Sequence, residues 1–185
     1  MIRLYDWKEN IKNEELKDAI NALKNGELIV FPTETVYGIG ADGFNSFAIK
    51  KIYEAKGRPA DNPLILHVSD FKMLEECVSN ISEVERKLID AFMPGPFTLI
   101  LDKKDIVPST VTANLSTVAV RMPNNKIANT IIKEFGKPIA APSANVSGKP
   151  SGTNIEDIKE ELGEKVFALI DGGNTDIGLE STVVK

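Results

Sequence analysis

The sequence predicts a single α/β domain, and three observations lead to that class. Amphipathic helical stretches alternate with short apolar runs along the whole chain, which is typical of helices packed on a sheet. A length of 185 residues with 42% hydrophobic content suits one domain with a sizeable core and hardly leaves room for a second. No repeat, low-complexity tract or linker divides the chain. We therefore expect one domain over residues 1–185.

Helices are predicted where apolar residues recur at helical spacing between start and stop signals. Ser82 with Glu85 forms a capping-box pattern, and Thr153 with Glu156 repeats it. The predicted helices are residues 13–25 before Gly26, NSFAIKKIYEAKG up to Gly57, the helix-like DFKMLEECVSN, Ser82 to about Phe92, about 125 to Phe135 before Gly136, and one that starts at Thr153.

Seven short apolar runs are predicted as strands of one sheet. They are ELIVF (27–31), LILHV (64–68), FTLIL (97–101), TVAVRM (117–122), PIAA (138–141), VFALI (166–170) and STVV (181–184). Several run directly into proline and small polar residues, in FPTET, RMPNN and APSAN. Proline cannot donate to a strand ladder and makes the preceding residue extended, so these strands should stop there with hydroxyl groups projecting from their ends.

The strand ends allow two interpretations. Ordinary turn chemistry accounts equally well for any one of them. Two ends with the same Pro-Ser/Thr-x-polar pattern, beside the strand that carries His67, fit better the crevice at strand ends where α/β proteins bind ligands. We therefore expect a ligand site at this edge of the sheet.

The composition excludes several classes of protein. A net charge of −5 gives no overall attraction for nucleic acid or an acidic membrane, so RNA binding would need a local patch. The one cysteine, Cys77, cannot form a disulfide framework or a cysteine zinc site and fits a buried thiol in a reducing cytosol. No apolar signal core opens the chain, and no run approaches the roughly 20 apolar residues of a membrane span. We expect a soluble, cytoplasmic protein.

GIGADG (Gly38 to Gly43) matches the dinucleotide-binding pattern G-x-G-x-x-G, but its context does not. Such a fingerprint occupies the tight turn that leaves a strand, whereas PTETVY separates Phe31 from Gly38 here. No stretch matches the P-loop pattern either. Any nucleotide would therefore be bound by side chains and scattered amides.

Lys56 and Arg58 are candidate ligands for a polyphosphate, because lysine supplies a point charge and arginine a planar fork for phosphate oxygens. The alternative is a solvated helix C-terminus, where cations suit the helix dipole. Gly57 and the stiff loop PADNP favour a site. His67 is either a satisfied core histidine, which is the commoner case, or a neutral imidazole that orients a small polar substrate.

Arg121 ends the apolar run TVAVR, where it could bind a carboxylate ligand at two points or form an internal ion pair. The loop APSANVSGKPSG (141–152) is either merely flexible or supplies Ser143, Asn145, Ser147 and Ser151 for hydrogen bonds to phosphate and ribose. No Asp-x-Asp or histidine cluster offers a metal site, so magnesium would arrive with a nucleotide. The sole histidine has no G-x-S-x-G partner for a nucleophile triad.

Six ordered segments resemble the Sua5/YrdC family, the threonylcarbamoyl-AMP synthases of tRNA modification. They span nearly the whole chain and are FPTETVYGIGADG, IYEAKGRPADNPLILHV, MPGPFTLIL, VAVRMP, APSANVSGKPSG and GLESTVV. They include the family's Lys-x-Arg and Ser-x-Asn signatures at Lys56/Arg58 and Ser143/Asn145. The resemblance implies a YrdC-like domain with a twisted, mixed parallel and antiparallel sheet, flanked by helices, and a concave ligand-binding surface. It places GIGADG in the family's first loop.

The resemblance also implies an enzyme, a nucleotidyltransferase that converts ATP, L-threonine and bicarbonate or CO2 to threonylcarbamoyl-adenylate and pyrophosphate. Mg2+ would come with the ATP, and the product would pass to a tRNA threonylcarbamoyl transferase complex, with a weak RNA contact and no membrane. Lys56 and Arg58 would be catalytic. ATP would contact Lys56, Arg58, Asn62, Thr117, Ser143, Asn145 and Ser151, and threonine would contact Thr35, His67, Arg121, the Ala141 backbone and Ser181.

The chain also departs from the family pattern, and two other functions stay open. After ESTVVK the family usually continues through another strand and an LRPG-like segment, and long members add a linker and a second domain, which puts ATP affinity and closure over the site in question. A non-enzymatic RNA-binding module is disfavoured by the acidic charge. A carbamoyl-transfer domain of hydrogenase maturation shares the fold, but those proteins usually carry zinc fingers, which one cysteine cannot form.

Overall fold

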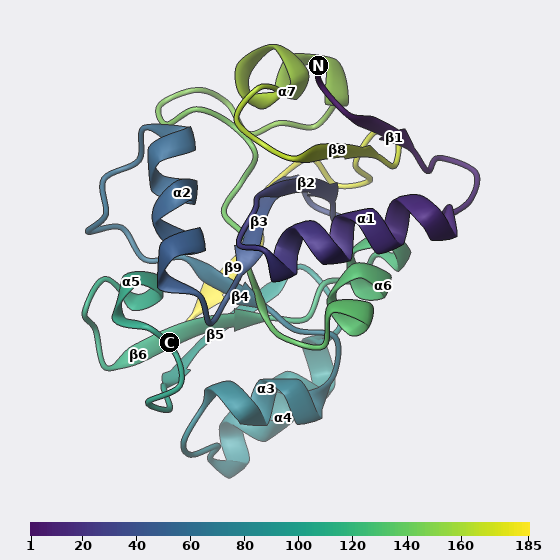
Figure 1. Ribbon diagram of the computed structural model, residues 1–185. Helices are drawn as coiled ribbons and strands as arrows, with labels where there is room; N and C mark the ends of the chain where they lie inside the picture. Colours follow the sequence, from purple (N-terminus) through teal and green to yellow (C-terminus); the bar gives the residue numbers. More distant parts are fainter.

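A nine-stranded mixed sheet forms the frame of the molecule, with the strand order β1-β8-β2-β3-β7-β4-β6-β5-β9 (Figure 1). The computed structural model describes residues 1–185. The strands are β1 (Leu4–Asp6), β2 (Ile29–Pro32), β3 (Tyr37–Asp42), β4 (Ile65–His67), β5 (Phe97–Asp102), β6 (Thr117–Arg121), β7 (Ile139–Ala140), β8 (Ala168–Asp171) and β9 (Thr182–Val184). Parallel and antiparallel pairs both occur, which confirms the predicted mixed sheet.

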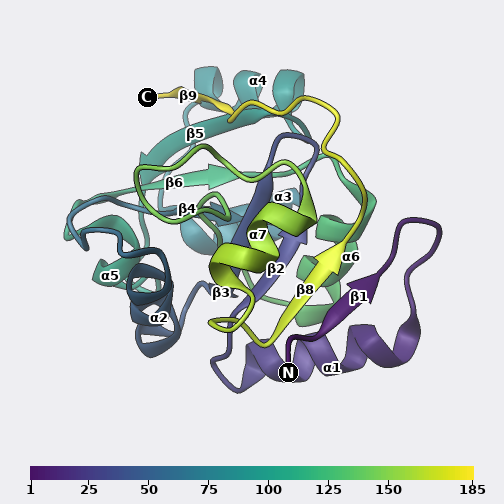
Figure 2. The ribbon, with the colours of Figure 1, turned by 90° about the horizontal axis from the view of Figure 1, so that it is seen from above.

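Seven helices flank the sheet. They are α1 (Asn13–Lys24), α2 (Ser46–Lys56), α3 (Phe71–Cys77), α4 (Glu83–Phe92), α5 (Ser109–Thr112), α6 (Lys126–Phe135) and α7 (Ile155–Leu162). α1 and α6 pack side by side against β2, and α7 contacts β8 on the opposite face of the sheet, as Figure 2 shows from above. None of the helices combines the length and the apolar character that a membrane span needs.

The helix ends follow the sequence signals closely. Ser82 and Glu85 form a reciprocal capping box at the start of α4, as predicted. Gly57 and Gly136 end α2 and α6 in the left-handed conformation, which glycine adopts without a side-chain clash. The predicted cap at Thr153 is wrong by one residue, because the side chain of Asn154 accepts the Asp157 N–H instead.

Strand β3 corrects the prediction that GIGADG lies in a loop. Residues 37–40 pair antiparallel with β2, residues 41 and 42 pair antiparallel with β7, and all six are buried. Glycine is required at position 40, because a Cβ there would lie 2.6 Å from Phe31 Cε1 and 2.8 Å from Ile139 Cγ2. The dinucleotide-like spacing therefore reflects close packing between strands.

Two further elements were not predicted. β1 is only three residues long and pairs parallel with β8 at the edge of the sheet. Such a short strand contains no apolar run from which it could be predicted. α5 is a single turn of four residues that packs against α2. With β1 and β3, the sheet has nine strands where the sequence predicted seven.

Candidate functional site

A pocket of about 290 Å³ opens where several strands end beside the turn between β2 and β3. Its inner lining includes Thr35, His67 and Arg121, and Arg58 with Glu180 contributes to it from outer segments. Chain segments that are far apart in the sequence thus meet here, as the strand-end prolines predicted.

A row of polar residues crosses the sheet at the inner end of this pocket. Arg121 of β6 is the register partner of His67 in β4 and of Thr98 in β5, so the three side chains project from the same face. All three are buried, with 4% or less of each residue exposed. Buried polar groups in an otherwise apolar sheet need hydrogen-bond partners, and neighbouring protein groups provide them.

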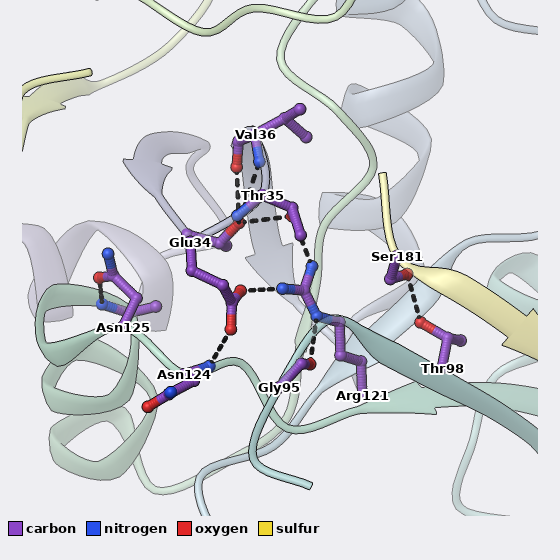
Figure 3. Close-up of polar contacts among 11 residues, drawn as sticks. Glu34, Thr35, Val36, Gly95, Thr98, Arg121, Asn124, Asn125 and Ser181 are labelled. Atoms are coloured by element: carbon purple, nitrogen blue, oxygen red, sulfur yellow. Dashed lines mark hydrogen bonds and ion pairs between the residues drawn. The ribbon is translucent and has the colours of Figure 1, made fainter. Parts of the chain in front are cut away.

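Arg121 is held by contacts from three directions (Figure 3). Its Nε donates to the Gly95 carbonyl at 3.2 Å, its Nη1 donates to Thr35 Oγ1 at 2.9 Å, and its Nη2 forms an ion pair with Glu34. The second Glu34 oxygen accepts the backbone N–H of Asn124. An internal ion pair therefore exists, and two of the five guanidinium N–H groups are still without a protein partner. Burial lowers the pKa of Arg121 to about 10, so it stays cationic at neutral pH.

His67 is neutral in this setting. Burial lowers its pKa to about 4. Its Nδ1 lies 3.3 Å from the Ile65 carbonyl oxygen, which can only accept, so this bond requires the proton on Nδ1. The other ring nitrogen, Nε2, is then an acceptor.

All five residues predicted to bind threonine line this one pocket: Thr35, His67, Arg121, Ala141 and Ser181. The Ser181 hydroxyl lies 2.7 Å from Thr98 Oγ1, which fixes its position on the wall (Figure 3). The structure therefore brings the whole set together, and the role of each member stays a prediction.

The residues predicted to bind ATP are more dispersed. Arg58 and Ser143 line the pocket, whereas Asn145 and Ser151 line a second hollow of about 540 Å³ beside α7. Thr117 lies at the opposite end of β6 from Arg121, and Asn62 is exposed in the loop that follows Arg58; neither lines the pocket.

Lys56 lines neither hollow and is buried, with 1% of the residue exposed. Its Nζ donates to the carbonyl of Ser143, to the carbonyl of Asn145 at 2.7 Å and to Asn145 Oδ1 at 3.4 Å. Burial lowers its pKa to about 8. Lys56 therefore holds the 143–145 loop from behind, and direct contact with phosphate stays a prediction.

Arg58 is half-buried and points its guanidinium toward the following loop, where Nη2 donates to the Pro63 carbonyl at 3.0 Å. Ser151 donates its hydroxyl hydrogen bond to Glu180, and this bond lowers the pKa of the Glu180 carboxyl. The outer part of the pocket thus carries one cation and one anion.

Sequence reasoning missed three residues of this region. Glu34 lies inside FPTET, where a carboxylate after a strand end could have been recognised as a partner for Arg121. Thr98 interrupts the apolar strand FTLIL, and a hydroxyl at a buried position signals a hydrogen-bond partner. Glu180 precedes Ser181 and reaches the pocket only through the tertiary fold.

The segment 172–181, here called the strap, connects β8 to β9 (Figure 2), and its last two residues, Glu180 and Ser181, line the pocket. The Ile177 N–H donates to the Glu34 carbonyl at 3.0 Å, and the Gly178 N–H donates to the Thr35 carbonyl at 2.9 Å. The strap therefore joins the turn between β2 and β3 to the wall that carries Glu180 and Ser181.

Comparison with known proteins gives consistent matches. The Sua5/YciO/YrdC family model, described as telomere recombination, matches residues 21–185. A threonylcarbamoyl-AMP synthase of Pyrococcus abyssi is 49% identical over 184 residues, which are 100% of this chain and 54% of that protein. One of Bacillus subtilis is 50% identical over 171 residues, which are 92% and 49% of the two chains. The chain spans about half the length of these relatives.

A solved structure gives the same picture at the level of the fold. The crystal structure of Pyrococcus abyssi Sua5 complexed with L-threonine superposes with a TM-score of 0.95 at 48% identity. The superposition covers 97% of this chain and 53% of that one.

Proposed function

Because this chain belongs to the Sua5/YciO/YrdC family, we propose that residues 1–185 form a YrdC-like domain that acts as a threonylcarbamoyl-AMP synthase. The reaction would be that of a nucleotidyltransferase, which converts ATP, L-threonine and bicarbonate or CO2 to threonylcarbamoyl-adenylate and pyrophosphate. The product would serve a downstream tRNA threonylcarbamoyl transferase complex in the cytoplasm. The observation that carries the proposal is the single pocket that holds all five predicted threonine contacts.

Threonine fits this pocket chemically. Its carboxylate would accept the two N–H groups that Arg121 leaves without a protein partner. Thr35, Ser181 and the neutral His67 would offer hydrogen bonds to the remaining polar atoms. The amine would then face the rest of the pocket and could react.

The chemistry needs alignment of two anions. The deprotonated amine attacks the carbon of CO2 to form a carbamate and releases a proton to solvent. A carbamate oxygen then attacks the α-phosphorus, and the bond to the departing pyrophosphate breaks. Arg58 at the outer wall would offset the charge of the phosphates, and Lys56 would support the Ser143–Asn145 loop against them.

Magnesium would enter as the Mg·ATP complex. The chain has no group of three or more His, Cys, Asp or Glu side chains arranged to hold a metal ion. Phosphate oxygens and water would therefore supply most of its ligands, as is usual for this ion.

Pyrophosphate release tests the proposal, measured with ATP, magnesium and bicarbonate in the presence and absence of L-threonine. We expect threonine-dependent release that is lost in Arg58→Ala and Lys56→Ala. Arg86→Ala is a matched control, because Arg86 is an exposed cation that pairs with Asp90 at 3.0 Å, away from the pocket. Release that ignores threonine, or a wild-type chain that binds neither ATP nor threonine, would contradict the proposed function.

A further inference from the structure

We propose that Glu34 is a positioning residue that fixes the Arg121 guanidinium and offsets its charge, and thereby makes the inner pocket selective for a zwitterionic amino acid over a simple carboxylic acid. The inference rests on the proposed function of the same pocket, and it concerns a residue that touches Arg121 rather than the substrate.

Glu34 is held at both ends. One carboxylate oxygen pairs with Arg121 Nη2, and the other accepts the backbone N–H of Asn124 (Figure 3). Its own carbonyl accepts the Ile177 N–H of the strap at 3.0 Å. The side chain is 8% exposed, so solvent does not compete for these contacts. The carboxylate therefore has one available orientation.

This orientation determines where the free N–H groups of Arg121 point. Glu34, Thr35 and the Gly95 carbonyl each accept from a different nitrogen of the guanidinium. A planar fork with three fixed contacts cannot turn, and its two remaining N–H groups keep a constant direction. Without Glu34, the Arg121 cation would be buried with neutral partners only. The desolvation of an unpaired charge costs free energy, so the guanidinium would tend to move to another position.

The charges of the inner pocket sum to zero. Arg121 carries one positive charge, Glu34 carries one negative charge, and His67 is neutral. Arg58 and Glu180, at the outer wall, also have opposite signs. A zwitterion adds no net charge to such a site, whereas a carboxylate without an ammonium group leaves one negative charge uncompensated in a buried place.

The test compares Glu34→Gln with the wild type by calorimetric binding. The two ligands are L-threonine and its analogue in which a hydroxyl replaces the ammonium group. We expect the variant to bind threonine roughly ten-fold more weakly and to lose roughly ten-fold of its preference for threonine over the analogue, a factor that corresponds to one lost charge interaction at a partly buried site. Its affinity for ATP should change less than about two-fold.

Asp171→Asn is the matched control. Asp171 is also a buried carboxylate that accepts a backbone N–H, from Gly173 at 2.9 Å, and pairs with a cation, Lys8, at 3.3 Å, but it does not line the pocket. This control should keep the preference of the wild type. Glu34→Asp retains the charge with a shorter reach, so it should bind threonine more weakly and still prefer it over the analogue.

Three results would overturn the inference. An unchanged preference in Glu34→Gln excludes a role of the Glu34 charge in selectivity. An equal loss of threonine and ATP binding, together with a lower thermal midpoint than in Asp171→Asn, shows a purely structural role. A wild-type chain that binds no threonine and shows no threonine-dependent pyrophosphate release overturns the proposed function as well, which distinguishes that failure from the first two.

Discussion

His67 shows how burial alone can decide the state of a site residue. The imidazole is enclosed between strands β7 and β6, and its pKa falls to about 4 because the charged form would lose its hydration. The unfolded chain has an ordinary histidine pKa near 6.5. At pH values between these two pKa values, the unfolded state binds a proton at His67 and the native state does not.

A pH dependence of stability follows for this residue. Burial of neutral His67 leaves the free energy of unfolding at its full value above about pH 6.5. This free energy falls as the pH drops from about 6.5 to about 4, because in this range only the unfolded state is protonated at His67. We expect the stability of His67→Gln to depend less on pH. Between these two pH values its free energy of unfolding should fall by less than that of the wild type, by on the order of 3 kcal/mol. Urea unfolding of both proteins at several pH values measures this difference, and parallel curves would refute it.

Single residues also show what could be predicted from the sequence and what could not. The predicted threonine set came from the family resemblance, because all its members lie in the family-like segments, and the fold brings them into one pocket. The burial of Lys56 could not be anticipated, because its partners are backbone carbonyls of a loop 87 to 89 residues away in the chain. Every residue has a backbone carbonyl, so the sequence does not show which carbonyls will bind a buried lysine.

At the scale of elements, amphipathic helices were predicted better than glycine-rich strands. α6 buries Ile127, Ile131 and Phe135 at helical spacing, and this pattern is readable directly. β3 lacks such a signal, since glycine is rare in strands, and only the family resemblance placed GIGADG, in a loop. Gly40 fits between Phe31 and Ile139 because it has no Cβ, and these neighbours come together only in the folded sheet.

Gly40→Ala tests this account of β3. The added methyl group would lie 2.6 Å from Phe31 Cε1, inside the packed sheet, so we expect a loss of about 1–3 kcal/mol in the free energy of unfolding. Gly38→Ala on the same strand is the control, because its Cβ would lie 3.3 Å from the Ala141 Cβ and needs a smaller adjustment. Denaturant unfolding of both variants provides the measurement, and equal losses would argue against close packing at Gly40.

At the scale of the whole molecule, one continuous core connects the site to the rest of the fold. The core cluster contains 49 buried residues from both ends of the chain, including Trp7 and Ile170. The chain should therefore unfold as one cooperative unit, and a ligand that binds the pocket should stabilise all of it.

Thermal unfolding with substrates checks this expectation. Under the proposed function, a threonine concentration of roughly 100 times its dissociation constant would add about 2.7 kcal/mol of stability and raise the midpoint of a chain of this size by roughly 5–10 °C. We expect one transition that shifts as a whole. Arg121→Lys should shift less, because lysine cannot reproduce the planar fork. Two separate transitions would contradict a single cooperative unit.

Under the proposed function, the depth of each residue in the pocket determines the order in which the two substrates bind. His67 and Arg121 are buried at the inner end, whereas Arg58 is half-buried and Glu180 is exposed at the outer wall. A nucleotide that rests on the outer wall would close the route to Arg121, so under the proposed function threonine is the leading substrate and ATP the following one. Steady-state kinetics would then be sequential and ordered, and the adenylate product could leave only with its nucleotide end first.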